Sequence, residues 1–187
     1  GAIPAPPAPM TAPTLPFASL WVSPFRPFCV LGVAYGLVLM AAWVAQNAGF
    51  AAGEGGMLAG RAWHGHEMLF GFALAVIVGF LLTAGKAWTG LGTPRGSALA
   101  ALALLWLAAR LAAVLAPYPV FAVLDMLLLP VVAGSLLRVL IRARNRRNIP
   151  RLARRLARAL ANAVFHLSVL ELIAVPAMSA LYAELAL

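Results

Sequence analysis

The sequence predicts an all-α protein, a polytopic transmembrane helical bundle with about five spans. Apolar residues make up 64% of its 187 residues, charged residues make up only 10%, and the mean hydropathy is +0.95. Soluble domains carry about 25% charged residues, so this composition indicates an integral membrane protein. Each span needs about 20 apolar residues, and a chain of this length with short connections holds about five.

We expect the spans near residues 28–48, 66–84, 97–116, 120–141 and 158–181. No charged residue lies between residues 28 and 53 or between residues 68 and 85, which supports the first two spans. Arg110, Asp125 and Glu171 interrupt the other three. The third and fourth have polar faces that are too thin for helices lying on the membrane surface, so we interpret them as spans as well.

The segment before the first span is rich in proline and alanine. Residues 1–24 contain seven of the fourteen prolines and lack the basic-then-apolar order of a cleavable signal. We expect an extended tail there, followed by a transmembrane helical domain over residues 25–187. Cys29 is the single cysteine, so no disulfide within the chain is possible, and we expect it to pack as an apolar residue.

Basic residues gather in one segment and predict the topology. Nine of the fourteen lie within residues 138–158, and we interpret residues 142–157 as a basic cytoplasmic loop. Alternation of the spans then places the N-terminus and the 86–96 loop in the cytoplasm as well. Residues 49–63, the 117–119 turn and the C-terminus are expected on the opposite side.

The same basic segment suggests partners. The simplest interpretation is a topology signal that also attracts anionic lipid to the segment from Arg138 to Arg158, at about 1 kcal/mol per basic residue. Specific binding of an acidic partner is the alternative. No nucleic-acid-binding motif accompanies the charge, so we expect the lipid bilayer and no nucleic acid as a partner.

Two charged residues fall inside neighbouring spans at similar depth. Arg110 comes out roughly 9 Å below the outer surface, and Asp125 reaches nearly the same depth after the tight 117–119 turn. Charges inside a bilayer are costly and are expected to find partners. The sequence therefore predicts an ion pair between Arg110 and Asp125, which either locks the two helices together or belongs to a site.

The stretch W-H-G-H-E-M at residues 63–68 places His64, His66 and Glu67 at the outer end of the second span. Residues two apart on a helix point about 200° apart, so both histidines face one centre only if the turn at Gly65 is irregular. In a regular helix Glu67 continues a stripe of small residues that favours close helix packing. The members of this stripe are Gly71, Ala75 and Gly79. His66 would share another face with Phe70, Ala73 and Ile77, an apolar wall that suits a flat macrocycle or lipid.

His166 is expected in the middle of the fifth span, with Asn162 one turn below it. Glu171, one turn above but on another face, is expected to be a further supporting polar residue. A neutral imidazole is a common axial ligand of haem and a ligand of copper, but a lone histidine inside a membrane is as often a hydrogen-bonding bridge between helices. On this placement His166 lies roughly 10 Å deeper than His66, which is too far for one metal ion. A haem could approach both regions.

Two separated blocks resemble a known family. H-G-H-E-M-L-F-G-F-A-L-A-V-I-V-G-F-L-L-T-A at residues 64–84 and W-T-G at residues 88–90 form the first block. R-N-R-R-N-I-P-R-L at residues 144–152 and A-N-A-V-F-H-L at residues 161–167 form the second. Together they are similar to the NnrS family, polytopic bacterial membrane proteins that contain haem and copper and are linked to nitric oxide and nitrosative stress. Its members are longer, so the resemblance identifies this chain as a half-length version.

The resemblance implies that His64, His66 and His166 are haem b or copper ligands. Glu67 and Asn162 would orient these histidines as supporting polar residues. It also implies a bacterial inner membrane location. In such a membrane, the topology predicted from the basic loop places the N-terminus in the cytoplasm and the C-terminus in the periplasm.

Two hypotheses about function follow. The first is a haem- or copper-binding membrane protein of nitric oxide metabolism, in which Arg110 and Asp125 shape the outer cavity. The second is a cofactor-free accessory or scaffold subunit of a larger respiratory, denitrification or photosynthetic membrane complex. No motif of a known enzyme class is present, so we expect that this protein is not an enzyme. A transporter would need an internal repeat, and none is visible.

Overall fold

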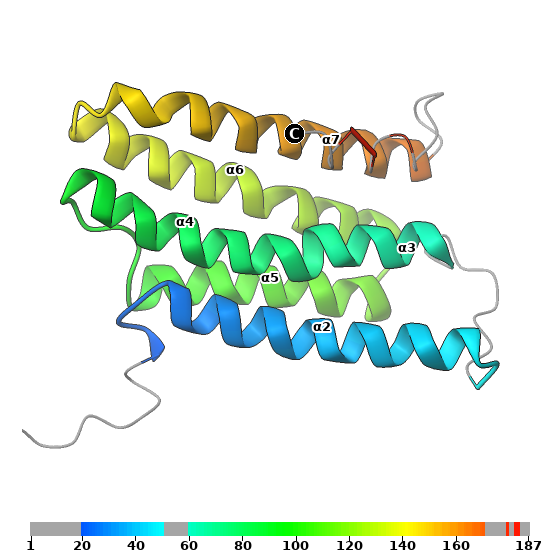
Figure 1. Ribbon diagram of the computed structural model, residues 1–187. Coiled ribbons are helices and arrows are strands. Elements are labelled where there is room, and N and C mark those ends of the chain that lie inside the picture. The colour runs from blue at the N-terminus through cyan, green and yellow to red at the C-terminus, as the bar shows by residue number, and fades with distance from the viewer. Residues whose placement is uncertain (1–19, 51–59, 171–178, 180–181, 184–187) are drawn as a thin grey trace, which may run out of the picture.

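The computed structural model describes residues 20–50, 60–170, 179 and 182–183 of this chain, and these parts contain helices and no strands (Figure 1). The order of elements is α2 (Phe25–Asn47), α3 (Arg61–His66), η1 (Glu67–Ala73), α4 (Leu74–Thr89), α5 (Ser97–Leu115), α6 (Tyr118–Arg142), η2 (Arg146–Asn148) and α7 (Ile149–Val169). All are α-helices except η1, which is a π-helix, and η2, a short 3₁₀ turn. The all-α prediction is confirmed.

Four helical rods are long and apolar enough to cross a membrane: α2, α5, α6 and the continuous rod Arg61–Thr89 that α3, η1 and α4 form together. A fifth rod, α7, lies along α6 (Figure 1). This arrangement agrees with the predicted bundle of about five spans. The predicted extended tail falls on residues 1–24, of which residues 1–19 lie outside the described part.

The predicted extent of the basic loop was wrong. We expected a basic loop over residues 142–157, but the connection after α6 is short and α7 already begins at Ile149. Pro150 in the first turn favours helix initiation, because its fixed φ is pre-organised for the helix. Leucines recur every fourth residue at Leu152, Leu156 and Leu160, a helical period that the high density of arginine obscured. The predicted end near residue 181 lies outside the described residues.

Short connections make neighbouring helices antiparallel. Consequently the start of α2, the end of α4, the start of α5, the end of α6 and the start of α7 lie at one end of the bundle (Figure 1). Basic residues gather there, so we call it the basic end: Arg26, Lys86, Arg95, Arg138, Arg142, Arg144 and Arg147. The other end, where α3 begins, is called the opposite end below.

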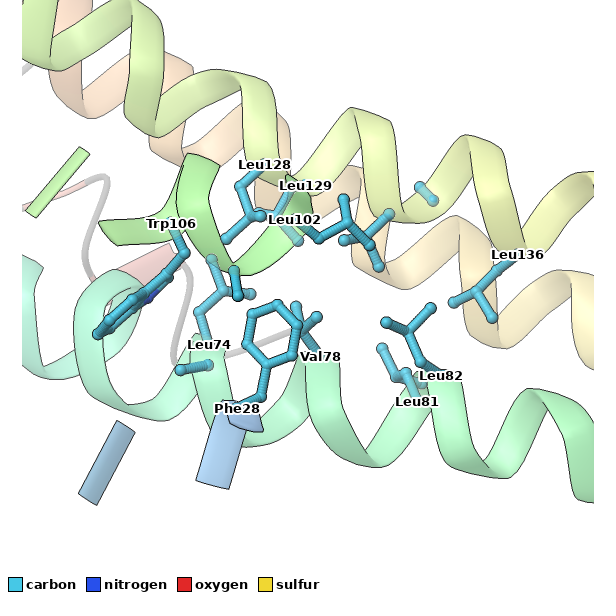
Figure 2. Close-up of a cluster of buried hydrophobic side chains, with 14 of the residues drawn as sticks. Phe28, Leu74, Val78, Leu81, Leu82, Leu102, Trp106, Leu128, Leu129 and Leu136 are labelled. Carbon is cyan, nitrogen blue, oxygen red and sulfur yellow. The ribbon is translucent and has the colours of Figure 1, made fainter. Parts of the chain in front are cut away.

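The apolar core lies where α4 meets α2, α5 and α6. Phe28, Val78 and Trp106 are almost fully buried in it, and leucines from three helices fill the space between them (Figure 2). These leucines include Leu74, Leu82, Leu102, Leu128 and Leu136. Their burial holds the helices at the distances that the polar residues near the opposite end require.

The predicted stripe of small residues packs against α2, as expected. A Cβ atom added at Gly79 would lie 2.9 Å from Phe28 Cβ, and one added at Gly32 of α2 would lie 3.2 Å from Ala75 Cβ. Real Cβ atoms are rarely this close, so both positions depend on glycine. The stripe brings the backbones of α2 and α4 into close contact.

Candidate functional site

Six buried polar side chains meet between the helices toward the opposite end, and we call them the polar cluster. They come from α3, η1, α5, α6 and α7, and each is at most 4% exposed. The members are His66, Glu67, Arg110, Asp125, Asn162 and His166. Burying so many polar groups inside a membrane is costly unless they bind one another or a ligand.

Arg110 joins both carboxylates of the polar cluster. Its Nη1 atom donates to Glu67 Oε2 at 2.5 Å, and its Nη2 atom pairs with Asp125 Oδ1. The ion pair that the turn geometry predicts between Arg110 and Asp125 is therefore present. Two carboxylates face one guanidinium, so one negative charge needs a further cation. A proton on a histidine or a bound metal ion would supply it.

Glu67 orients His66. Its Oε1 atom lies 3.1 Å from His66 Nδ1, and a carboxylate only accepts, so Nδ1–H donates to it. The hydroxyl of Tyr35 on α2 donates to the other oxygen, Oε2. Gly71 makes this contact possible, because a Cβ there would lie 2.6 Å from Tyr35 Cε1.

Asn162 links His66 to Asp125. Its Nδ2 atom donates to Asp125 Oδ2 at 2.7 Å, which fixes the amide so that Oδ1 faces His66 Nε2 at 3.1 Å. The same Nε2 atom lies 3.4 Å from Asp125 Oδ2. Both nitrogens of His66 therefore face oxygen acceptors, an arrangement that favours a cation at this position, either the imidazolium itself or a metal ion on Nε2.

His166 is held in the same way from the other side. Its Nε2 atom lies 3.1 Å from Asp125 Oδ2, and its Nδ1 atom lies 2.8 Å from the hydroxyl of Tyr118. Asp125 accepts, so the neutral ring carries its proton on Nε2 and Nδ1 accepts from Tyr118. If Nε2 bound a metal ion instead, Nδ1–H would donate to the tyrosine oxygen.

His66, Asp125 and His166 offer three ligand atoms that all lie within 4.8 Å of one another. The prediction that His66 and His166 lie roughly 10 Å apart in depth was therefore wrong. Its cause is the early start of α7 at Ile149, which carries His166 farther toward the opposite end than a helix starting at residue 158 would. The two imidazole rings are 5.0 Å apart between centroids.

Aromatic rings close this centre. Phe70, Phe121 and Phe165 lie with centroids 5.0, 5.7 and 4.5 Å from the ring of His66. His66 therefore faces the protein interior, not lipid. A single metal ion fits this donor set, since two imidazoles and a carboxylate form a common transition-metal site. A haem macrocycle does not fit between these rings, because Nε2 of each histidine faces side chains of the polar cluster.

His64 lies apart from the polar cluster. Its ring stacks on Trp43 of α2, with centroids 4.2 Å apart and planes inclined by 20°. It is partly exposed, and its buried Nδ1 atom has no hydrogen-bond partner. The structure therefore brings together two of the three histidines predicted as ligands and leaves His64 on another face. Glu171, predicted as a supporting residue, lies outside the described residues.

Sequence reasoning missed three residues around the polar cluster: Tyr35, Trp106 and Tyr118. Trp106 donates from Nε1 to the carbonyl oxygen of Gly71 at 3.0 Å, inside the π-helix η1. Single π-helical turns occur often at functional sites. One signal was available for Tyr118, which is the polar residue of the turn that brings α5 and α6 together. Tyr35 and Trp106 lie in uniformly apolar helices and give no such signal.

Four apolar helices that can span a membrane, and a polar cluster buried between helices, define a multi-pass helical membrane protein. A family model described as NnrS protein matches residues 19–187. The chain belongs to the NnrS family, as its two sequence blocks indicate. No curated protein and no solved structure matches it.

Proposed function

We propose that this NnrS-family membrane protein binds a single copper ion at His66, Asp125 and His166 and acts in the response to nitric oxide and nitrosative stress. The observation that carries the metal site is the convergence of three buried ligand atoms from three helices within 4.8 Å. Imidazole nitrogen suits copper among the transition metals. The link to nitric oxide rests on family membership.

The remaining residues of the polar cluster support such a centre. Glu67 holds His66 through Nδ1 and leaves Nε2 for the ion, the arrangement that usually orients a metal-binding histidine. Tyr118 does the same for His166. Arg110 neutralises one carboxylate charge, and the ion would balance the other. When bound, copper supplies a redox-active centre that can bind nitric oxide.

Haem is the other cofactor that family membership suggests. His64 is the histidine whose surroundings suit it best, since its ring lies at a partly exposed edge of the bundle beside the flat indole of Trp43. Its Nδ1 atom is buried and makes no hydrogen bond, so Nε2 would be the ligand atom. A haem there would lie against α2 and α3, away from His66.

Metal analysis of the purified protein tests the copper site. We expect about one copper per chain, with nitrogen hyperfine coupling in the electron paramagnetic resonance spectrum of the Cu(II) form. His66→Ala and His166→Ala should each lower copper affinity by about 10- to 100-fold or more. Arg61→Gln, an exposed residue of α3, serves as the control.

Copper retention that does not change in either histidine variant would contradict the site. A reduced-minus-oxidised absorption spectrum tests haem separately, since a haem at His64 should give a Soret band that disappears in His64→Ala. Size-exclusion profiles and helical circular dichroism confirm that each variant is folded before its metal content is compared.

One observation favours a second candidate, a cofactor-free accessory or scaffold subunit of a larger membrane complex. Both nitrogens of His66 and of His166 already have partners within the chain, so the polar cluster also works as a lock between helices. Helix α2 additionally leaves Val33, Leu37 and Val44 more than half exposed, on a face open to lipid or to another subunit. A folded, metal-free preparation that co-purifies with other membrane subunits would favour this candidate.

A further inference from the structure

At the basic end of the bundle, a pocket opens where two distant parts of the sequence meet. It has a volume of about 370 Å³ and is lined by Trp88, Asn145, Arg147 and Asn148. Trp88 lies at the end of α4, and the other three belong to the connection between α6 and α7. Both sequence blocks noted above contribute, although nothing in the proposed metal centre uses these residues.

Hydrogen bonds shape the pocket. Asn145 donates from Nδ2 to the carbonyl oxygen of Trp88 at 2.9 Å, and Asn148 donates from Nδ2 to Asn145 Oδ1 at 3.2 Å. Arg144 supports the turn in a left-handed conformation, with φ of 52°. The asparagine side chains therefore tie the connection to α4, while the exposed Arg147 contributes a basic residue to the pocket lining.

The sequence around this pocket carries a large excess of positive charge. Residues 86–96 and 138–158 contain eleven basic residues and none of the five acidic residues. Glu67 lies about 30 Å away along the rod that ends at Thr89, and Asp125 lies on α6 about 25 Å before Arg142. Neither of the two acidic residues that the structure describes therefore lies near the basic end, and this charge favours the binding of an anion there.

We propose that this pocket binds a phosphate group, with Arg147 as its main ligand. A planar guanidinium matches two phosphate oxygens at once, and α7 begins at Ile149, directly after the pocket residue Asn148. The pocket lies at the end of the spanning helices, at the depth of lipid headgroups, with a tryptophan of the kind enriched there. The phosphate belongs either to an anionic phospholipid or to a free phosphate compound.

Binding measurements on the full chain in lipid nanodiscs test this site. Native mass spectrometry measures retained phosphatidylglycerol against phosphatidylcholine, and a titration with inorganic phosphate in phosphatidylcholine nanodiscs measures the soluble source. We expect Arg147→Gln to weaken the binding of one of these probes by about tenfold. Arg147→Lys keeps the charge but loses the planar guanidinium that contacts two oxygens at once, so its affinity should lie between those of Arg147→Gln and the native protein.

Arg142→Gln is the matched control, because Arg142 is exposed at the same end and does not line the pocket. It should change binding by less than about twofold. If Arg147→Gln loses only phosphatidylglycerol binding, the ligand is a lipid headgroup. If it loses inorganic phosphate binding, the ligand is a soluble phosphate compound. Equal losses in Arg142→Gln and Arg147→Gln would overturn the proposal, as would no loss for either probe. The outcome is independent of the metal centre, which lies at the opposite end.

Discussion

At the scale of single residues, Arg110 decides whether the polar cluster is stable. Its guanidinium is 3% exposed and contacts Glu67 and Asp125 from two other helices. One arginine therefore holds η1, α5 and α6 together at one point. Its Nε atom is buried without a hydrogen-bond partner, so the contribution of Arg110 comes from its two terminal nitrogens.

We predict that Arg110→Met destabilises the protein by about 3–5 kcal/mol, because it removes the guanidinium that pairs with both buried carboxylates. Reversible denaturation in detergent micelles, followed by tryptophan fluorescence, measures the free energy of unfolding. Arg142→Gln, which changes an exposed arginine, should stay within about 0.5 kcal/mol of the native protein. If Arg110→Met lowered the free energy of unfolding by less than about 1 kcal/mol, the ion pairs of Arg110 would contribute no more than solvent-exposed ion pairs do.

Sequence reasoning found most residues of the polar cluster but not their geometry. The pairing of Arg110 with Asp125 was predicted from their depths, both counted from the tight 117–119 turn. Each residue is only a few positions from this turn, so the error in either depth was small. His66 and His166 are 100 residues apart in the sequence, and the distance predicted between them depended on where α7 begins. An error in that one boundary separated two side chains that the structure places in contact with Asp125.

At the scale of elements, the π-helix η1 and helix α2 fit together around Gly71. The added Cβ of an alanine at this position would lie 2.6 Å from Tyr35 Cε1 and 2.9 Å from Glu67 Oε2. Trp106 also reaches the backbone here, and its ring packs edge-on against Tyr35 with centroids 5.5 Å apart. Glycine is therefore required for the contact between Tyr35 and Glu67.

We predict that Gly71→Ala destabilises the protein by about 1–3 kcal/mol, because the methyl group overpacks the interface and displaces Tyr35 from Glu67. Thermal unfolding followed by circular dichroism measures the change. The matched control is Gly134→Ala in α6, where an added Cβ meets nothing within 4 Å. There alanine should be neutral or stabilising by up to about 1 kcal/mol, since glycine weakens a helix interior. Similar losses in both variants would show that the space around Gly71 is not the cause.

The boundaries of the elements were predictable where apolar residues dominate. The second span extends farther at both ends than expected, from Arg61 to Thr89, because polar residues at its ends remain helical. The start of α7 was not predictable from hydropathy, since its first turns carry four arginines. Helical periodicity was the better signal there. The π-helical turn has no sequence signature that we recognise.

At the scale of the whole molecule, charge and polarity are separated along the bundle. The basic end carries arginines and the proposed phosphate pocket, whereas the polar cluster lies about 30 Å away toward the opposite end. Basic loops are retained in the cytoplasm. The predicted topology, which rests on this same asymmetry, places the basic end in the cytoplasm and the proposed metal centre near the outer surface.

Cysteine labelling tests this topology. In a Cys29→Ser background, we place single cysteines at Gly92, exposed in the connection at the basic end, and at Ala48, exposed after α2 at the opposite end. A maleimide that cannot cross membranes should label Ala48→Cys in intact spheroplasts. It should label Gly92→Cys only after the membrane is permeabilised, because the basic end faces inward. The reverse labelling pattern would contradict the predicted topology. It would place the polar cluster near the cytoplasm, on the side away from metal ions that enter from the periplasm.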